Sequence, residues 1–213
     1  MGALCAWLAS PAKATVMVAT FNGTLLDSYS QDFAGDFGSP GSLLGKDFTL
    51  TVIYDTTLGM VRSPSPYDNR VGGSYHANVG PIVSAKLTIN NISQMFDVTV
   101  YSYVAAAEGE FSTFASQAGP LTPQFGDNFA AFSHVGTSPN NLTTPYTLEE
   151  PCEYCGNFWL HDATGARTSQ GAFYVTGANV APLAVPEPST WALLILGFGG
   201  VGATLRRQRT VVA

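Results

Sequence analysis

The chain has 213 residues, of which 46% are apolar, 12% aromatic and only 11% charged, and its net charge is −6. This length suits one folded domain with processing segments, and the abundant apolar and aromatic residues argue against disorder. Between residues 15 and 185 there are fourteen acidic residues and only five basic ones, namely Lys46, Arg62, Arg70, Lys86 and Arg167. Binding to nucleic acid needs a basic face, so this acidic body excludes it.

The amino-terminal end has features of an export signal. Residues 2–9 are small and apolar, and Ala12-Lys13-Ala14 fits the small-x-small pattern that signal peptidase recognises. No basic residue precedes Lys13, whereas a signal peptide begins with a positively charged stretch. We therefore expect residues 1–14 to be a truncated signal peptide that is cleaved after Ala14. The alternative is an ordinary first strand that runs from residue 1.

Residues 15–184 are expected to form one exported, β-rich domain, because their dominant hydrophobic period is two. Apolar and polar residues alternate over residues 48–54 and 83–89. They alternate again over residues 96–101, after a turn at Asn90-Asn91, which predicts a hairpin. Further strands are expected at residues 16–25, 129–135, 157–161 and 172–180. Short strands separated by Gly, Pro, Ser and Asn clusters predict a mainly β fold, an antiparallel β-sandwich or jelly roll.

Long connections are expected at residues 27–46, 59–80 and 112–128. The first is rich in glycine and carries acidic side chains, and carboxylates are the ligands that Ca²⁺ prefers. Asp32 and Asp36 are therefore weak calcium candidates. The spacing of an EF-hand is absent, so a solvated acidic loop is the favoured interpretation, and no metal or other cofactor is predicted.

Tyr101 and Tyr103 are candidates for stacking on sugars, since exposed aromatic rings with a polar end serve this purpose on β domains. Phe158 and Trp159 offer a second aromatic pair, for which packing in the core is the favoured interpretation. The sequence therefore permits a carbohydrate-binding module as an alternative to a purely structural domain.

Catalysis finds little support in the sequence. G-x-S-x-G, H-E-x-x-H and Walker A motifs are absent, and His76, His134 and His161 are isolated from one another. Glu108 and Glu110 are the candidates for the two carboxylates of a glycosidase, but Gly109 between them and the three alanines before them favour a loop there instead. No catalytic residue is predicted and the protein is not expected to be an enzyme. A secreted hydrolase is kept as the less favoured alternative.

Cys152 and Cys155 form a C-x-x-C pair. In an oxidising compartment, the two cysteines that remain after signal removal make an even pair, and a local disulfide is the favoured interpretation. A redox pair, a metal site that adds His161 and Asp162, and free thiols are the alternatives. Closing so short a loop stabilises the fold by about 2 kcal/mol.

The carboxyl-terminal end has three parts in a fixed order. Pro186-Glu187-Pro188 comes first, and its prolines keep the strip extended. Residues 191–205 carry no charge and, as a helix, span roughly 22 Å, so we expect one short transmembrane helix there. The basic tail follows, and the positive-inside rule keeps it in the cytoplasm with the preceding domain outside; its cations are Arg206, Arg207 and Arg209.

This order of parts over residues 185–213 resembles the PEP-CTERM sorting signal. The resemblance implies that Pro186, Glu187 and Pro188 are recognised by an exosortase, an integral-membrane protease of Gram-negative bacteria that also export polysaccharide. It further implies an inner-membrane precursor that, once processed, belongs to the cell surface or to an extracellular exopolysaccharide matrix or biofilm. Asp32, Asp36-Phe37-Gly38 and Tyr54-Asp55-Thr56 are similar to the opening of other PEP-CTERM ectodomains, and this similarity names no activity.

Overall fold

A computed structural model gives the fold and describes residues 16–62, 68–107, 110–116, 127–134, 141–147, 150–183 and Phe198; for residues 132–134 only the backbone is described. The chain divides into two compact units, Met1–Leu183 and Ala184–Ala213. The strands are β1 Val16–Asp32, β2 Gly41–Ser42, β3 Asp47–Asp55, β4 Met60–Val61, β5 Asp68–Gly72, β6 Ile82–Ile89, β7 Ile92–Phe96, β8 Tyr101–Ala107, β9 Glu110–Ser116, β10 Asn128–His134, β11 Tyr146–Thr147, β12 Gly156–His161 and β13 Arg167–Pro182, and a short 3₁₀ helix, η1, covers Ser74–His76.

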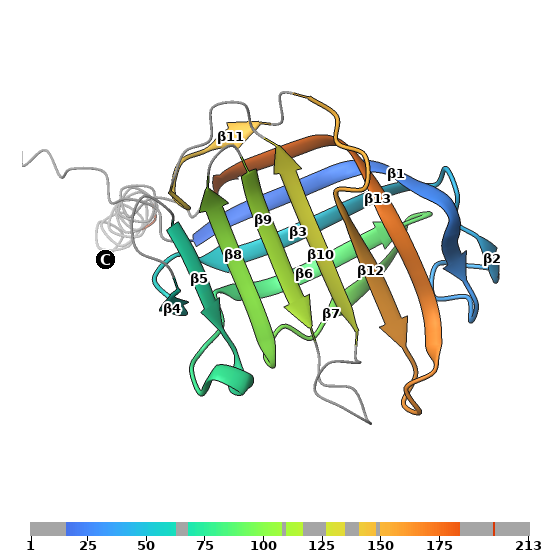
Figure 1. Ribbon diagram of the computed structural model, residues 1–213, viewed down its shortest axis with the longest axis horizontal. Coiled ribbons are helices and arrows are strands. Elements are labelled where there is room, and N and C mark those ends of the chain that lie inside the picture. Colours follow the sequence, from blue (N-terminus) through green and yellow to red (C-terminus); the bar gives the residue numbers. More distant parts are fainter. Residues whose placement is uncertain are drawn as a thin grey trace, which may run out of the picture. The chain divides into compact units, whose positions relative to one another are not determined.

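The described strands form one antiparallel sheet in the order β4-β5-β8-β9-β10-β12-β13-β1-β3-β6-β7, with β11 on β13 and β2 on β1. The sheet curls so that β5, β8, β9, β10 and β12 cross in front of β1, β3, β6 and β7 (Figure 1). The predicted mainly β, antiparallel class is confirmed. The two facing layers belong to one continuous sheet, because the 17-residue β1 and the 16-residue β13 run together through the curl.

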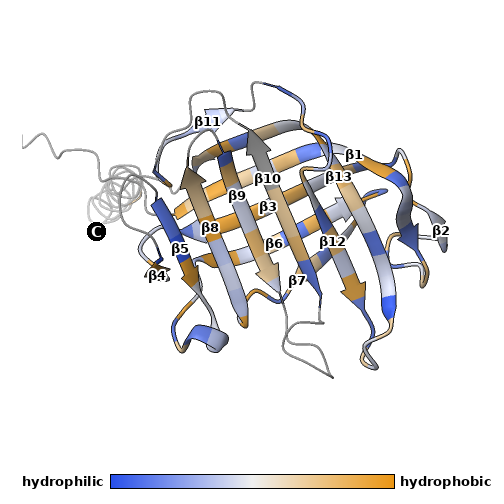
Figure 2. Cartoon of the chain, viewed as in Figure 1, coloured by the Kyte–Doolittle hydropathy of each residue, from blue (hydrophilic) through white to orange (hydrophobic). Residues whose placement is uncertain are grey.

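The core lies between the two parts of the curled sheet. Apolar and polar residues alternate along the strands, as the bands of colour in Figure 2 show, and β3 buries every second residue. Phe111 of β9 contacts aromatic rings from three other strands, with ring centroids 6.3 Å from Phe21, 5.8 Å from Tyr54 and 5.3 Å from Tyr146. Alternation with a period of two therefore gives each part of the sheet one apolar face, and burial of these two faces against each other stabilises the curled sheet.

The predicted hairpin at Asn90-Asn91 is confirmed, but its second strand was misplaced. Both asparagines have positive φ (51° and 64°), as a two-residue hairpin turn requires, and β7 begins immediately afterwards, at Ile92. The strand expected at residues 96–101 is replaced by the end of β7 at Phe96, a connection over residues 97–100 and the start of β8 at Tyr101. Asp97 accepts hydrogen bonds from the backbone N–H and the hydroxyl of Thr99, and this local turn ends the ladder.

Further expectations about loops were wrong. β1 extends to Asp32 and β2 lies within the connection expected at residues 27–46, and β4, β5 and η1 lie within the one expected at residues 59–80. The alanines before Glu108 lie in β8, and β9 extends to Ser116, inside the connection expected at residues 112–128. Alanines form the backbone hydrogen bonds of a strand as well as large residues do when both neighbouring strands supply partners. The alanine-rich composition was therefore a misleading sign of a loop.

Within the part of the chain that the structure describes, no helix has the length and apolar character needed to cross a membrane. Apart from Phe198, the span expected at residues 191–205 lies outside the described residues. The same is true of the signal peptide with Ala14, the Pro186-Glu187-Pro188 strip, and the arginines Arg206, Arg207 and Arg209.

Candidate ligand-binding groove

A row of side chains crosses four strands on the outer face of the sheet. Tyr101 in β8 is paired with Ser116 in β9, Ser116 with Asn128 in β10, and Asn128 with Trp159 in β12. Neighbouring strands lie about 4.8 Å apart, so the two aromatic residues are separated by roughly 14 Å. Ser116 and Asn128 are only 8% and 4% exposed. The row therefore has aromatic ends and a polar floor.

A cluster of aromatic rings surrounds the Tyr101 end of this row. The centroid of the Tyr101 ring lies near four other ring centroids, at 5.3 Å from His76, 5.6 Å from Phe114, 6.4 Å from Tyr103 and 6.5 Å from Tyr75. Tyr103 and Phe114 stack at 5.6 Å with only 12° between their planes. We call the residues Tyr75, His76, Tyr101, Tyr103 and Phe114 the aromatic cluster.

Backbone contacts of η1 bring two members of the cluster to the sheet. The N–H groups of Ser74 and Tyr75 donate to the carbonyls of Thr99 and Val100, at 2.8 and 3.0 Å. Gly73 makes this approach possible, because a Cβ there would lie 2.3 Å from the Val100 oxygen. Tyr75 is left 66% exposed.

A hollow of about 460 Å³ lies over the row and the cluster, and Tyr75, His76, Tyr101, Phe114 and Trp159 are among its lining residues, with the floor residues of the row. A smaller hollow of about 130 Å³ is lined by Asn69, Tyr103 and Ala105 among others, and Arg62 and Val71 line both. We call the two hollows together the outer groove. Its aromatic walls and few polar groups are typical of ligand sites.

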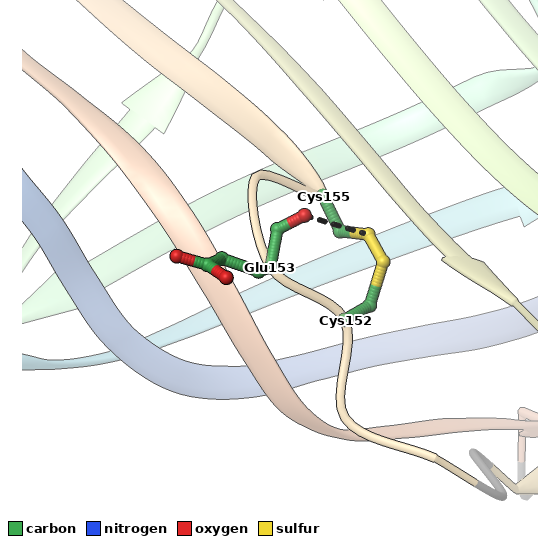
Figure 3. Close-up of a disulfide and its surroundings, with 3 residues drawn as sticks. All are labelled: Cys152, Glu153 and Cys155. Carbon is green, nitrogen blue, oxygen red and sulfur yellow. Dashed lines mark hydrogen bonds between the residues drawn. A yellow bond between two sulfur atoms is a disulfide. The ribbon is translucent and has the colours of Figure 1, made fainter.

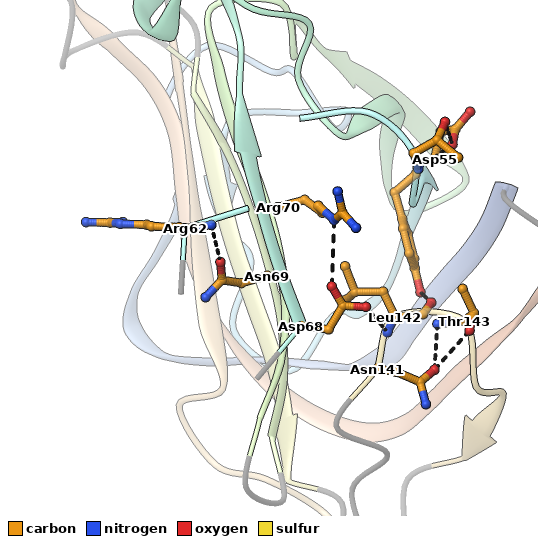
Figure 4. Close-up of polar contacts among 10 residues, drawn as sticks. Asp55, Arg62, Asp68, Asn69, Arg70, Asn141, Leu142 and Thr143 are labelled. Carbon is orange, nitrogen blue, oxygen red and sulfur yellow. Dashed lines mark hydrogen bonds and ion pairs between the residues drawn. The ribbon is translucent and has the colours of Figure 1, made fainter. Parts of the chain in front are cut away.

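Arg62 stands at the junction of the two hollows. Its backbone N–H donates to the side chain of Asn69 at 2.8 Å, and its guanidinium points away from β5 (Figure 4). Arg70 and Asp68 lie on the other side of β5, where they form an ion pair of 3.7 Å. Among the described residues, Arg62 has no acidic partner.

The groove differs in charge from the acidic body. Arg62 lines both hollows, and the Arg167 guanidinium lies 5.1 Å from the centre of the Trp159 ring, whereas Arg70 of the smaller hollow is paired with Asp68 on the other side of β5. Two of the five basic residues of the body, Arg62 and Arg167, thus adjoin the groove without an acidic partner among the described residues. None of the described residues that line the hollows is acidic. Burial raises the pKa of Tyr103, so its hydroxyl stays protonated.

The structure brings the predicted pair Tyr101 and Tyr103 together on one face, with ring centroids 6.4 Å apart. The favoured prediction that Phe158 and Trp159 both pack in the core is confirmed for Phe158 and wrong for Trp159. Phe158 is fully buried, but Trp159 follows it in the strand and so points outward, where its indole N–H donates to the Tyr29 hydroxyl. Sequence reasoning missed Tyr75, His76 and Phe114 because only the folded chain unites them.

Of the weak calcium candidates, Asp32 is the last residue of β1 and Asp36 lies in the loop that follows. Asp32 is 2% exposed, and its carboxylate accepts backbone N–H bonds from Gly35, Asp36 and Phe37, at 2.7 to 3.0 Å. The Ser169 hydroxyl lies within hydrogen-bonding distance of both carboxylates, 3.0 Å from Asp32 and 2.6 Å from Asp36. These contacts give Asp32 a structural role as the acceptor around which the loop folds.

Cys152 and Cys155 are joined by a disulfide in the loop before β12 (Figure 3). The loop is also tied to β13, since Cys152 exchanges two backbone hydrogen bonds with Val175 and the N–H of Cys155 donates to Phe173. Both cysteines are buried, and the segment that follows them is a strand, not the helix of a thioredoxin-like site. Among the described residues, no group of three or more His, Cys, Asp and Glu could hold a metal ion.

Comparison with known families gives one match. The family described as the PEP-CTERM protein-sorting motif matches residues 184–209, which include the Pro-Glu-Pro strip and the arginines of the tail. No curated protein and no solved structure matches the chain. The chain therefore carries a PEP-CTERM sorting motif, while its β domain is described by its own geometry alone.

Proposed function

We propose that this chain, which carries a PEP-CTERM protein-sorting motif, is a non-enzymatic protein of the cell surface or extracellular matrix, associated with exopolysaccharide. The motif at residues 184–209 carries this proposal and supports export and processing by an exosortase. The acidic, antiparallel β domain is the part that remains outside the cell once the signal has been processed.

The route begins with export and removal of the amino-terminal segment by signal peptidase. The precursor then stays in the inner membrane of a Gram-negative bacterium, with residues 191–205 as its anchor and the basic tail inside. The short, glycine-rich span is a provisional anchor, because roughly 22 Å of helix falls short of a bilayer core of about 30 Å. An exosortase reads the extended Pro186-Glu187-Pro188 strip.

Replacing Pro186, Glu187 and Pro188 together with alanine is expected to leave the full-length precursor in the inner membrane. Fractionation of the producing strain, with mass measurement of the exported protein, checks this. The matched control is a triple alanine variant at Thr210, Val211 and Val212, beyond the matched residues, which should be processed normally. Unchanged processing of the Pro-Glu-Pro variant contradicts the sorting proposal.

Carbohydrate binding is the second candidate function, and the outer groove favours it. Sugar rings present C–H faces that stack on aromatic side chains and hydroxyls that need hydrogen-bond partners. The groove supplies aromatic rings at Tyr101 and Trp159 and a buried polar floor between them.

Tyr101→Ala is expected to weaken retention of the full chain on the host's own exopolysaccharide about tenfold, because a stacking ring at the centre of the aromatic cluster is lost. Affinity electrophoresis with the polysaccharide in the gel measures the change. Tyr174→Ala is the matched control, since Tyr174 lies in β13 and does not line the groove. Equal retention of the parent and both variants contradicts sugar binding at this site.

A hydrolase has less support from the groove. Glycosidases use two carboxylates, and none of the described lining residues has one. His76 and Ser116 both line the larger hollow, but His76 Nε2 has no hydrogen-bond partner among the described residues. An activated serine needs such a bond to its base.

A further inference from the structure

We propose that the outer groove binds an acidic polysaccharide, with a sugar carboxylate held by Arg62 between the two hollows. This rests on the proposed carbohydrate-binding function and specifies its ligand. The proposal follows from the charge and the shape of the groove, which differ from those of the rest of the domain.

The charge of the groove selects an anion. The body carries fourteen acidic residues, so an acidic polymer is repelled by most of its surface. Arg62 lines both hollows and has no acidic partner among the described residues, while Arg167 covers the Trp159 ring at the far end of the row. Glu110, the first residue of β9, and Asp127, which precedes β10, line neither hollow. A guanidinium beside aromatic walls is suited to a carboxylate because its planar fork binds both oxygens.

The shape of the groove selects a chain, not a single sugar. The row from Tyr101 to Trp159 extends roughly 14 Å across the strands, which exceeds the width of one sugar ring. The smaller hollow continues the site past Arg62 along β5 and β8, where Tyr103 and Asn69 provide another ring and an amide. In a polymer with a carboxylate on each sugar ring, one carboxylate lies beside Arg62 wherever along its length the polymer binds. A single arginine at the junction of the hollows is therefore enough to contact the charge of the polymer.

The test compares two polymers that differ only in the carboxylate. Polygalacturonate and its carboxyl-reduced, neutral derivative are placed in affinity gels, and the full chain is run in detergent with EDTA present so that no divalent cation bridges two anions. We expect retention by the acidic polymer, and retention that falls as salt is raised, because exposed charge pairs are screened. The neutral derivative should retain the chain at least tenfold less.

The protein variants are matched in charge. Arg62→Gln is expected to weaken binding to the acidic polymer about tenfold, the effect of losing one charge-assisted contact. Lys86→Gln removes the same charge from β6, where the side chain is exposed and lines neither hollow, and should leave binding unchanged. Arg62 is exposed, so its replacement should not change the unfolding midpoint.

Three outcomes overturn the inference. Equal binding of the neutral derivative, with Tyr101→Ala still weakening it, shows a neutral-sugar site and leaves carbohydrate binding intact. Equal losses in Arg62→Gln and Lys86→Gln show that net charge, not the groove, governs retention. Retention by neither polymer nor the host's own polysaccharide removes the carbohydrate-binding proposal as well.

Discussion

Replacing Asp32 with alanine is expected to lower the free energy of unfolding by about 4 kcal/mol. The carboxylate is nearly fully buried and accepts three backbone N–H bonds, so its removal leaves Gly35, Asp36 and Phe37 without their acceptor. Each buried donor left unsatisfied costs about 1–3 kcal/mol, and bonds to a charged acceptor are at the upper end of the range. A domain of this size is stable by only about 5–15 kcal/mol in total.

The loss extends into the core because the Asp32 loop carries Phe37. The Phe37 ring is 1% exposed and packs edge-on against Phe158 at 5.7 Å. The loop is also held by the β6–β7 hairpin, since Asn90 and Gln94 donate to the carbonyls of Phe37 and Asp36. Asp32 therefore supports the contact between distant parts of the sheet.

Urea unfolding of the full chain in detergent, followed by tryptophan fluorescence, measures the Asp32 effect. Asp32→Asn retains one acceptor oxygen and should lose about half as much stability. Asp55→Ala is the matched control, because Asp55 forms a similar turn contact to Thr57 in an exposed position and should cost about 1 kcal/mol or less. If EDTA destabilises the parent protein but not the Asp32→Ala variant, a bound cation holds the loop instead.

Phe111→Ala is expected to have a comparable effect, about 3–5 kcal/mol, for a different reason. Phe111 is 1% exposed and its ring contacts Phe21, Tyr54 and Tyr146 across the core. Truncation removes these contacts and leaves a cavity that the surrounding strands cannot fill without shifting. Since Phe111 joins β9 to β1 and β3, the curl of the sheet is weakened where its two parts meet.

Phe114→Ala is the matched control in the same strand. Phe114 lies three residues further on, and its side chain faces the outer groove, so its loss should cost no more than about 1.5 kcal/mol but weaken sugar binding. Paired unfolding and affinity-gel measurements on the two variants separate stability from binding. A large loss of stability in Phe114→Ala, or a small one in Phe111→Ala, contradicts the assignment of the two faces.

Alternation of apolar and polar residues was enough to predict the class of fold and several strands. It failed where a local side-chain contact competes with the ladder, as at Asp97, and where small residues fill a strand, as at Ala105 to Ala107. The continuous curl of the sheet also escaped prediction. It depends on β1 and β13 pairing with each other over most of their length, a non-local contact without a local signature.

The candidate site was predictable only in part. Tyr101 and Tyr103 were recognised as possible sugar-stacking residues, and the structure places them in the aromatic cluster. Trp159 was assigned to the wrong face. Phe158 and Trp159 are consecutive in a strand and point to opposite faces, and because both are aromatic the sequence does not reveal which of them faces the core. Tyr75 and His76 join the cluster through the turn at Gly73, which depends on a close backbone approach to Val100.

The pairing of β1 with β13 has a consequence for the order in which the domain folds during export. β1 begins the described domain and β13 ends it, with Met17 opposite Pro182 and the Leu183 N–H donating to the Val16 carbonyl. A chain that crosses the membrane from its amino end therefore cannot complete its central ladder until residue 182 has emerged. Such late, long-range pairing is slow, which helps to keep the chain unfolded for translocation. Completion of the domain therefore waits for almost all of the chain that precedes the matched sorting motif at residues 184–209.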